Sequence, residues 1–393
     1  MAFEKLTQLL DGLVDGHGVP GSDCIVIRDH EVLYRHMRGY SDYDRKVPVS
    51  DRDMYYLYSC TKVVTNTAIL KLVEDGRIHL YDPVAKYLPE FEYMRVTNHF
   101  DEGIPNDHLG HPAIEEACHY AARPIRIIDL CAMMGGLSYQ VTADEIREAC
   151  RKADGKISTR GMMAAIAKMP LLYEPGTRWY YSLCHDVLGG LIEETSGKKF
   201  GTYLKDEIFS PLGIEEDITF HLNEEQEKRL AAVYKFNLGD NKIKPCARDE
   251  SYMLSPEYDS GGAGLLGTVN AYSTILDALA CGGVGKNGVR ILKEDTVKMF
   301  STSVTTGQAL KDIQRSEGSE YGYGIGVRVK INTKRGRGPV GEFGWGGAAG
   351  AYVCVDPVDH LSIFYAQHVM NHDVCGQRFH PQIRDLAYEG AGI

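Results

Sequence analysis

Ser59 and Lys62 lie three residues apart in the stretch YLYSCTKVVT, and their types and spacing suggest chemistry. Because residues i and i+3 share one face of a helix, the lysine amine can reach the serine hydroxyl. Serine becomes a nucleophile when a neighbouring group takes its proton, and lysine can take it once its pKa is lowered. The pair is therefore a candidate nucleophile and base. The ordinary structural alternative is an N-cap serine followed by a solvent-facing lysine.

The spacing alone is weak evidence, since it recurs at Ser196 and Lys199 beside the glycine of a helix end, where nothing else suggests catalysis. The residues after Ser59 carry an apolar i, i+4 pattern that predicts a helix ending near Gly76. A serine at a helix N-terminus meets the positive end of the helix dipole. Its backbone N–H can then supply half of an oxyanion hole.

The elements that must position this pair come from both ends of the sequence. Residues 3–13 carry an apolar stripe typical of an amphipathic helix, and a hairpin follows with its turn at Arg28-Asp29-His30. Helical patterns dominate from residue 125 to about 239. Strand patterns return at 321–369, and residues 377–390 are expected to form a last helix. The sequence therefore predicts a β-containing layer shared by the two ends and a helical block between them.

Composition restricts the class of protein. The chain has 393 residues, 44% hydrophobic and 25% charged, as in a soluble globular protein. The net charge of −11 argues against a nucleic-acid partner. No window is long and apolar enough for a membrane span, and the N-terminus does not resemble a signal peptide. Ten cysteines without a CxxC pair are expected to be reduced thiols, so we expect a cytoplasmic protein that does not associate with membranes.

The context of the Ser-x-x-Lys motif carries a resemblance. The segment YLYSCTKVVTNTAILKLVEDGRIHLYDPVAKYLPEF resembles the nucleophile region of the serine β-lactamase and penicillin-binding-protein superfamily, in its class C-like branch. Later segments, PIRIIDLCAMMGGLSY, EPGTRWYYSLCHDVLGGLIEETSG, DSGGAGLLGTVNAYSTILDAL and YGYGIGVRV, are similar in type and order. The resemblance implies an α/β (α+β) fold with a central antiparallel sheet flanked by the terminal helices. Residues 1–85 and 255–393 would form this region, residues 86–254 a mainly helical region, and the active site the cleft between them.

The family's tyrosine motif matches Tyr181-Ser182-Leu183. The resemblance implies that Tyr181 shuttles protons beside the serine and lysine, with a phenolate stabilised by Lys62 as one form it could take; Tyr180 is the alternative register. Leu183 stands where the family has an asparagine that binds the substrate; the resemblance implies a substrate contact at this position, although leucine offers no amide there. His185 and Asp186 also suggest a triad, but they fall on the next helix, where solvated or capping roles are expected.

The third motif matches Trp345-Gly346-Gly347, as in the family VIII carboxylesterases. The resemblance implies that these residues contact substrate and that the Ala348 N–H is the second oxyanion donor, beside that of Ser59. Without a cation at 345, the site lacks a partner for a lactam or peptide carboxylate and a positive neighbour for Lys62. Desolvation of Lys62, or Tyr181 acting as the base, would have to compensate. Tyr139 is expected at the pocket rim.

Other sites are less well supported by the sequence. His108, His111, Glu115, Cys118 and His119 contain metal-ligand types but no HExxH pattern, so no metal site is expected. The chain has no Gly-x-Ser-x-Gly elbow, and GGAGLLG lacks the context of a dinucleotide site. We therefore expect no cofactor.

The expected function is a serine carboxylesterase that acts on a small-molecule ester through an acyl-enzyme. An acyltransferase, a weak β-lactamase and a D-amino-acid peptidase remain alternatives on the same chemistry, and a non-catalytic relative is a further one. The sequence predicts neither the physiological substrate nor the oligomeric state.

Overall fold

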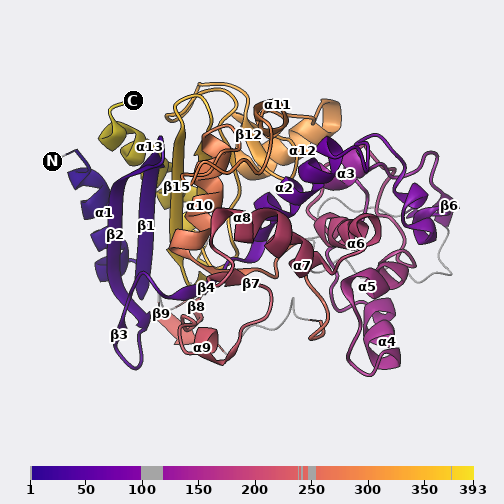
Figure 1. Ribbon diagram of the computed structural model, residues 1–393, viewed down its shortest axis with the longest axis horizontal. Coiled ribbons are helices and arrows are strands. Elements are labelled where there is room, and N and C mark those ends of the chain that lie inside the picture. Colours follow the sequence, from indigo (N-terminus) through magenta and orange to yellow (C-terminus); the bar gives the residue numbers. More distant parts are fainter. Residues whose placement is uncertain (1, 99–117, 238, 240–241, 247–253, 373) are drawn as a thin grey trace.

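The computed structural model describes the chain except for residues 1, 99–117, 238, 240–241, 247–253 and 373 (Figure 1). An eight-stranded antiparallel sheet has the strand order β11-β12-β13-β14-β15-β1-β2-β3. Its strands are β1 (Gly21–Arg28), β2 (Glu31–Asp42), β3 (Val47–Pro48), β11 (Tyr321–Tyr323), β12 (Arg328–Lys330), β13 (Phe343–Gly344), β14 (Tyr352–Asp356) and β15 (Leu361–Gln367). The two ends of the sequence therefore meet in one sheet, with β1 paired to β15, and the predicted fold class is confirmed.

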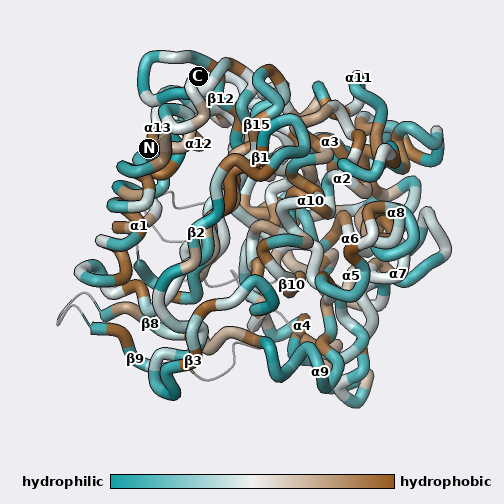
Figure 2. The backbone as a smooth tube through the Cα atoms, turned by 60° about the vertical axis from the view of Figure 1, so that its left-hand side comes forward, coloured by the Kyte–Doolittle hydropathy of each residue, from teal (hydrophilic) through white to brown (hydrophobic). Residues whose placement is uncertain are grey.

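The predicted hairpin joins β1 to β2. Asp29 and His30 have φ values of 49° and 67°, the left-handed conformation that a two-residue hairpin turn requires. The alternation along β1 divides its side chains between two layers: Val26 packs in one core cluster, and Ile25 and Ile27 in another. This strand can be followed as a brown, hydrophobic segment in Figure 2.

Helices cover both faces of the sheet. On one face lie α1 (Glu4–Gly16) and α13 (His380–Ala391), which contact each other and share a core cluster with Val26. The buried residues of α1 are Leu6, Leu10 and Leu13, from the predicted apolar stripe. On the other face α10 (Val269–Ala280) packs on β1, β14 and β15. Figure 1 shows the two terminal helices and α10 on opposite sides of the sheet.

The second half of the molecule is mainly helical. Its helices are α3 (Ile127–Cys131), α4 (Asp144–Lys152), α5 (Thr159–Ile166), α6 (Cys184–Ser196), α7 (Phe200–Leu204), η4 (Lys205–Phe209) and α8 (Ser210–Leu212). The short helix α9 (Glu224–Glu227) follows them in the sequence but lies on the side of the sheet (Figure 1). Helix α2 (Thr61–Glu74) comes from the N-terminal part of the sequence but packs on α6 and α7. It therefore connects the sheet half to the helical half, and Gly76, with φ of 66°, follows its end as predicted.

Shorter elements complete the described structure. They are β4 (Met54–Tyr56), η1 (Tyr58–Cys60), η2 (Val84–Lys86), η3 (Pro89–Phe91), β5 (Arg95–Thr97), β6 (Cys118–Tyr120), β7 (Ile218–Thr219), β8 (Tyr234–Asn237), β9 (Lys242–Pro245), β10 (Leu266–Thr268), α11 (Glu294–Val297), α12 (Gly307–Glu317), β16 (Val369–Met370) and η5 (Cys375–Phe379). Strand β10 lies between β4 and β7, and β16 pairs in parallel with β8. The sequence of residues 125 to about 239 shows mainly helical patterns, but this segment thus also contains strands. The partners of these strands lie far along the sequence.

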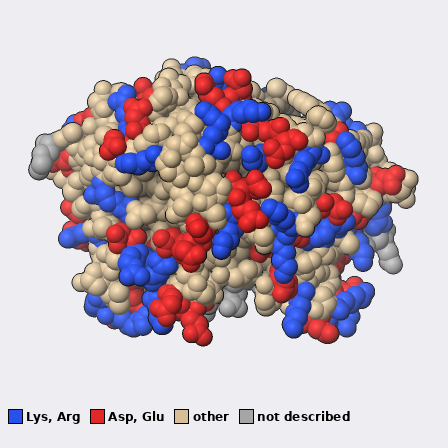
Figure 3. All heavy atoms as spheres, in the orientation of Figure 1, with Lys and Arg blue, Asp and Glu red and all other residues tan. Residues whose placement is uncertain are grey.

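The surface mixes charges of both signs. On the face drawn in Figure 3, lysine and arginine side chains alternate with aspartate and glutamate rather than gathering into one basic area. Proteins that bind nucleic acid place basic residues together, so the face shown offers no feature of that kind. In the part of the chain that the structure describes, none of the helices has the length and apolar character needed to cross a membrane.

Candidate active site

Ser59 lies in the short turn η1, directly before α2 begins at Thr61. The chain arrives from β4, which is fixed by pairing with β10. Tyr58 has a φ of 44°, an uncommon value for a tyrosine, and its ring is buried and stacks on Tyr56 with centroids 5.5 Å apart. Strained backbone of this kind persists where packing holds it in place, and it is common at functional sites. The strand, the stacked ring and the helix together fix the position of the serine.

Lys62 is fully buried on the first turn of α2, not solvent-facing. Its Nζ donates to Ser59 Oγ at 3.2 Å and to the Gly262 carbonyl at 2.6 Å, and it lies 4.5 Å from the centre of the Tyr181 ring. Burial disfavours the charged ammonium and lowers the pKa of Lys62 to about 7, against the opposing effect of Asp186. Desolvation therefore makes this amine a base near neutral pH without a second lysine beside it.

Tyr181 also contacts the serine, with its hydroxyl 2.5 Å from Ser59 Oγ. Its ring stacks on Trp345, whose indole N–H donates to the Tyr181 hydroxyl at 3.3 Å. Burial raises the pKa of Tyr181, so the phenol keeps its proton at neutral pH and a phenolate is disfavoured. The neighbouring Tyr180 instead packs against Tyr173, away from the serine, so Tyr181 is the tyrosine that the structure brings to Ser59.

Trp345, Gly346 and Gly347 follow β13, and they line a cavity together with Ser59, Tyr181 and Ala348. A Cβ on Gly347 would lie 2.8 Å from the carbonyl of Leu57, so glycine lets this segment approach the turn that carries the serine. Ala348 is exposed, and no hydrogen bond of its N–H occurs among the described residues. The Ala348 N–H can therefore serve an oxyanion at the mouth of the site.

The cavity has a volume of about 960 Å³ and extends well beyond the serine. Away from Ser59 its wall comes from α12, β11, β12 and α13 and includes Arg315, Tyr321, Arg328 and Arg384. Arg328 is nearly fully buried between the rings of Tyr321 and Tyr352, with its guanidinium about 5 Å from each centroid. One end of the cavity is thus aromatic and carries the serine, and the other is polar and charged.

Two residues expected to contact substrate have other positions. Leu183 is the N-cap of α6 and is buried in the apolar core, and it is not part of the lining of the described cavity. Tyr139 packs its ring 5.2 Å from that of Tyr181 and is likewise not part of that lining. The substrate contact expected of Leu183 thus stays a prediction, and the burial of its side chain in the core does not favour it.

His185 and Asp186 are fully buried on α6, which corrects the expectation of solvated or capping roles. His185 Nε2 lies 3.1 Å from the Cys131 carbonyl, and burial lowers the pKa of His185 to about 3. Asp186 accepts hydrogen bonds from Tyr258 at 2.8 Å and from Ser260 at 2.6 Å. The sequence drew attention to Asp186 but did not predict its buried position beside Lys62. A buried carboxylate near a lysine is visible only once residues 258–262 pack against α6.

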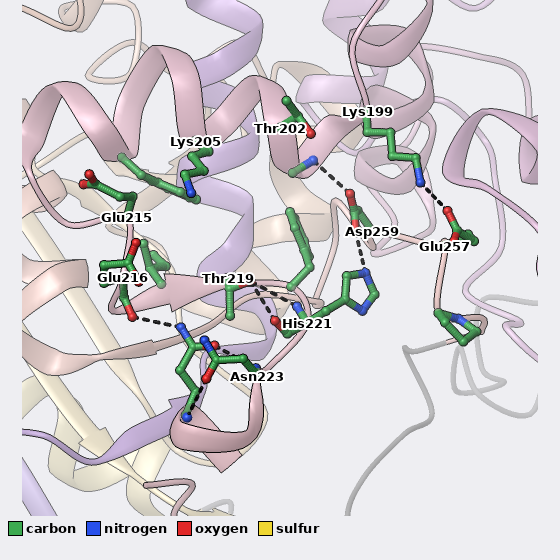
Figure 4. A pocket seen from close by; sticks show the side chains of 16 residues that line it. Lys199, Thr202, Lys205, Glu215, Glu216, Thr219, His221, Asn223, Glu257 and Asp259 are labelled. Atoms are coloured by element: carbon green, nitrogen blue, oxygen red, sulfur yellow. Dashed lines mark hydrogen bonds and ion pairs between the residues drawn. The ribbon is translucent and has the colours of Figure 1, made fainter. Parts of the chain in front are cut away.

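A second, smaller cavity of about 380 Å³ lies between α7 and β7 (Figure 4). Four of its lining residues pair with one another. Asp259 accepts from the Gly201 N–H and the His221 ring, and Lys199 pairs with Glu257. Figure 4 shows these side chains turned toward their partners. The cavity therefore lacks the nucleophile and base of the first one.

The candidate metal ligands of the sequence are only partly described. His108, His111 and Glu115 lie outside the described residues, and His119 contacts Asn98 and Glu174. Within the described ranges, one other group of metal-ligand types comes together, His30, Asp277 and Cys281, with donor atoms within 4.8 Å of one another. The described residues of these two sets, Cys118, His119, His30, Asp277 and Cys281, do not line the cavity at Ser59.

Comparison with known proteins gives the same fold. The solved structure of EstCE1, a hydrolase with promiscuous acyltransferase activity, matches with a TM-score of 0.78 and 22% identity over 98% of both chains. A family VIII carboxylesterase matches with a TM-score of 0.75 and 20% identity, over 99% of this chain and 97% of that one. Protein Rv1367c of Mycobacterium tuberculosis is 26% identical over 353 residues, which cover 88% of this chain and 84% of that protein. The beta-lactamase family model matches residues 6–386, and this chain therefore belongs to the beta-lactamase family of serine hydrolases.

Proposed function

We propose that this protein is a serine carboxylesterase that acts on small esters through an acyl group on Ser59. One observation carries the proposal: the Lys62 amine and the Tyr181 hydroxyl converge on Ser59 Oγ, at 3.2 and 2.5 Å. A hydroxyl between a depressed-pKa amine and a protonated phenol has both a proton acceptor and a proton donor within reach.

The reaction follows from these protonation states. Ser59 Oγ attacks the ester carbonyl carbon while its proton passes to the Lys62 amine. The N–H groups of Ser59 and Ala348 stabilise the carbonyl oxygen as it becomes negative. When the C–O bond to the alcohol breaks, the Tyr181 phenol gives its proton to the leaving oxygen and takes one back from Lys62. Water then attacks the acyl group by the same route in reverse and releases the acid and free Ser59.

The wall beside the serine supports esters over lactams and peptides. Trp345 presents an indole where a cation would be needed to pair with a substrate carboxylate. The Trp345 indole, which donates to the Tyr181 hydroxyl, also stands where a charged side chain would otherwise lie next to the phenol. Esters have better leaving groups than amides, so they demand less proton delivery. Two structural neighbours, the hydrolase EstCE1 and a family VIII carboxylesterase, agree with this choice.

Acyl transfer to an alcohol is the second candidate. An acyl-serine reacts with any hydroxyl that reaches it, and EstCE1 is described as having promiscuous acyltransferase activity. Transfer differs from hydrolysis only in the acceptor, so the two share every residue named above.

The test compares the wild-type protein with Ser59→Ala on a nitrophenyl ester, nitrocefin and a D-alanine amide, with and without an added alcohol. We expect ester hydrolysis to exceed the other two reactions, and Ser59→Ala to lose it. Transfer to the alcohol as the main product would favour the second candidate. Undiminished ester hydrolysis by the alanine variant would contradict both.

A further inference from the structure

Asp186 lies behind the Ser59–Lys62 pair and does not contact the cavity at Ser59. It projects from the first turn of α6 and is about 2% exposed. Its Oδ1 accepts hydrogen bonds from the hydroxyls of Tyr258 and Ser260. Burial raises the pKa of Asp186, and these two hydroxyls, the Lys62 amine and the Gly262 N–H act in the opposite direction, in favour of the carboxylate. Three hydrogen-bond donors hold this buried carboxylate in a single orientation. Burying a carboxylate costs desolvation free energy, which an apolar side chain at this position would not cost. This arrangement calls for a role beyond stability.

Gly262 connects Asp186 to the lysine. Its carbonyl accepts from Lys62 Nζ at 2.6 Å. A Cβ built on Gly262 would lie 2.6 Å from Asp186 Oδ2 and 3.6 Å from Lys62 Nζ. Asp186 Oδ2 and Lys62 Nζ are therefore at most about 6.2 Å apart. The carboxylate and the amine lie on either side of Gly262, which has no side chain to fill the space between them. Any larger residue at 262 would separate them.

The other titratable groups around Lys62 are thiols, an imidazole and phenols. They are Cys60 from η1, Cys184 and His185 from α6, and the rings of Tyr139 and Tyr181. Burial raises the pKa of Cys60 to about 12 and that of Cys184 to about 11, and the imidazole of His185 is uncharged at neutral pH. Among the described residues around this amine, Asp186 is therefore the one that offers a negative charge.

We propose that Asp186 is a positioning residue for the lysine of the acyl-serine reaction, an inference that rests on the proposed function. Its carboxylate holds the Lys62 amine against the Gly262 carbonyl, within reach of Ser59. It also sets the pH at which that amine becomes free to accept the serine proton. Tyr258 and Ser260 keep the carboxylate in place from the far side.

The test is Asp186→Asn, which keeps the side-chain shape and removes the charge. Two charges about 6 Å apart at an effective dielectric constant near 20 shift a pKa by about one to two units. Without the carboxylate, protonated Lys62 is less favoured. The acid limb of the kcat/KM profile should therefore move to lower pH by about that amount. Because the carboxylate no longer holds the Lys62 amine in position, kcat should fall about tenfold or more with KM nearly unchanged.

Asp259→Asn is the matched control. Asp259 is also a buried carboxylate, three residues before Gly262, but its partners are Gly201 and His221 and it does not act on Lys62. We expect its acid limb to stay at the wild-type pH. Where Asp186→Asn does not fold, Gly262→Ala replaces it, because the added Cβ must displace the carboxylate while every charge remains. That variant should also move the acid limb to lower pH.

A second measurement separates this proposal from the proposed function. The ε-carbon NMR signal of Lys62, assigned by its loss in Lys62→Met, reports the protonation of the amine without any substrate. A titration midpoint that is lower in Asp186→Asn than in the wild type supports the proposal even if no ester is hydrolysed. Equal titration midpoints in Asp186→Asn and the wild type would overturn it. Equal acid limbs of the two proteins would also overturn it if the enzyme is active, and this holds even where acylation of Ser59 supports the proposed function.

Discussion

Replacing Lys62 by methionine should make the folded protein more stable while removing its activity. Lys62 is completely buried, and burial lowers its pKa from 10.5 to about 7. In the unfolded chain the lysine regains the pKa of 10.5, so between these two values the unfolded state binds a proton that the folded state does not. The lysine therefore costs stability. The full cost applies below pH 7, and it disappears as the pH rises to about 10.5.

The magnitude follows from the same two values. Each pH unit in this window is worth about 1.4 kcal/mol, so at pH 8 the unfolded state gains about 3 kcal/mol from Lys62. Methionine removes that term but leaves the Gly262 carbonyl without its donor, a loss of about 1 kcal/mol. Lys62→Met should thus be about 2 kcal/mol more stable than the wild type at pH 8. The difference should approach zero or reverse near pH 10.

Urea unfolding at several pH values measures this difference, with the exposed Lys311→Met as the control for losing one lysine. We expect the control to match the wild type throughout. A Lys62→Met variant that is less stable at pH 8, or whose difference does not change with pH, would refute the reasoning that Lys62 is buried as a free amine.

Three further predictions concern the reaction. The kcat/KM of the wild type for a nitrophenyl ester should rise with pH and level off above about 7, because Lys62 must lose its proton to act as a base; a profile flat from pH 5 to 9 would argue against it. Trp345→Phe keeps a ring on Tyr181 but removes the N–H donor, so kcat should fall about tenfold in steady-state assays, and an unchanged kcat would show that this hydrogen bond does not matter. Gly347→Ala places a Cβ 2.8 Å from the Leu57 carbonyl, so we expect a folded protein by circular dichroism with activity lowered about a hundredfold, and wild-type activity would contradict the close approach.

Local sequence patterns predicted the elements whose conformation is determined by residues that are close together in the sequence. The hairpin turn at Asp29 and His30, the apolar stripe of α1 and the helix that ends before Gly76 all depend on neighbours within a few residues. The order of motifs, carried by a family resemblance, predicted the fold. The structure also brings Ser59, Lys62 and Tyr181 together, although the roles assigned to them remain proposals.

The rest depended on contacts between distant segments. Asp186 looked like a surface helix residue because its partners, Tyr258 and Ser260, come more than seventy positions later. Leu183 was expected at the substrate, yet its side chain faces the core once α6 packs. The suggestion of a phenolate at Tyr181 failed for a related reason: the burial that disfavours the phenolate is a property of the assembled aromatic cluster, which no local pattern reveals.

The acyl-serine is the central claim, and mass spectrometry of the protein after brief incubation with a nitrophenyl ester tests it most directly. Digestion of the acid-quenched sample should give one acylated peptide, modified at Ser59, in the wild type. The same peptide should be unmodified in Ser59→Ala and in Lys62→Met. An ester-hydrolysing protein that carries no acyl group on Ser59, with the group instead on another residue or on none, would contradict the account.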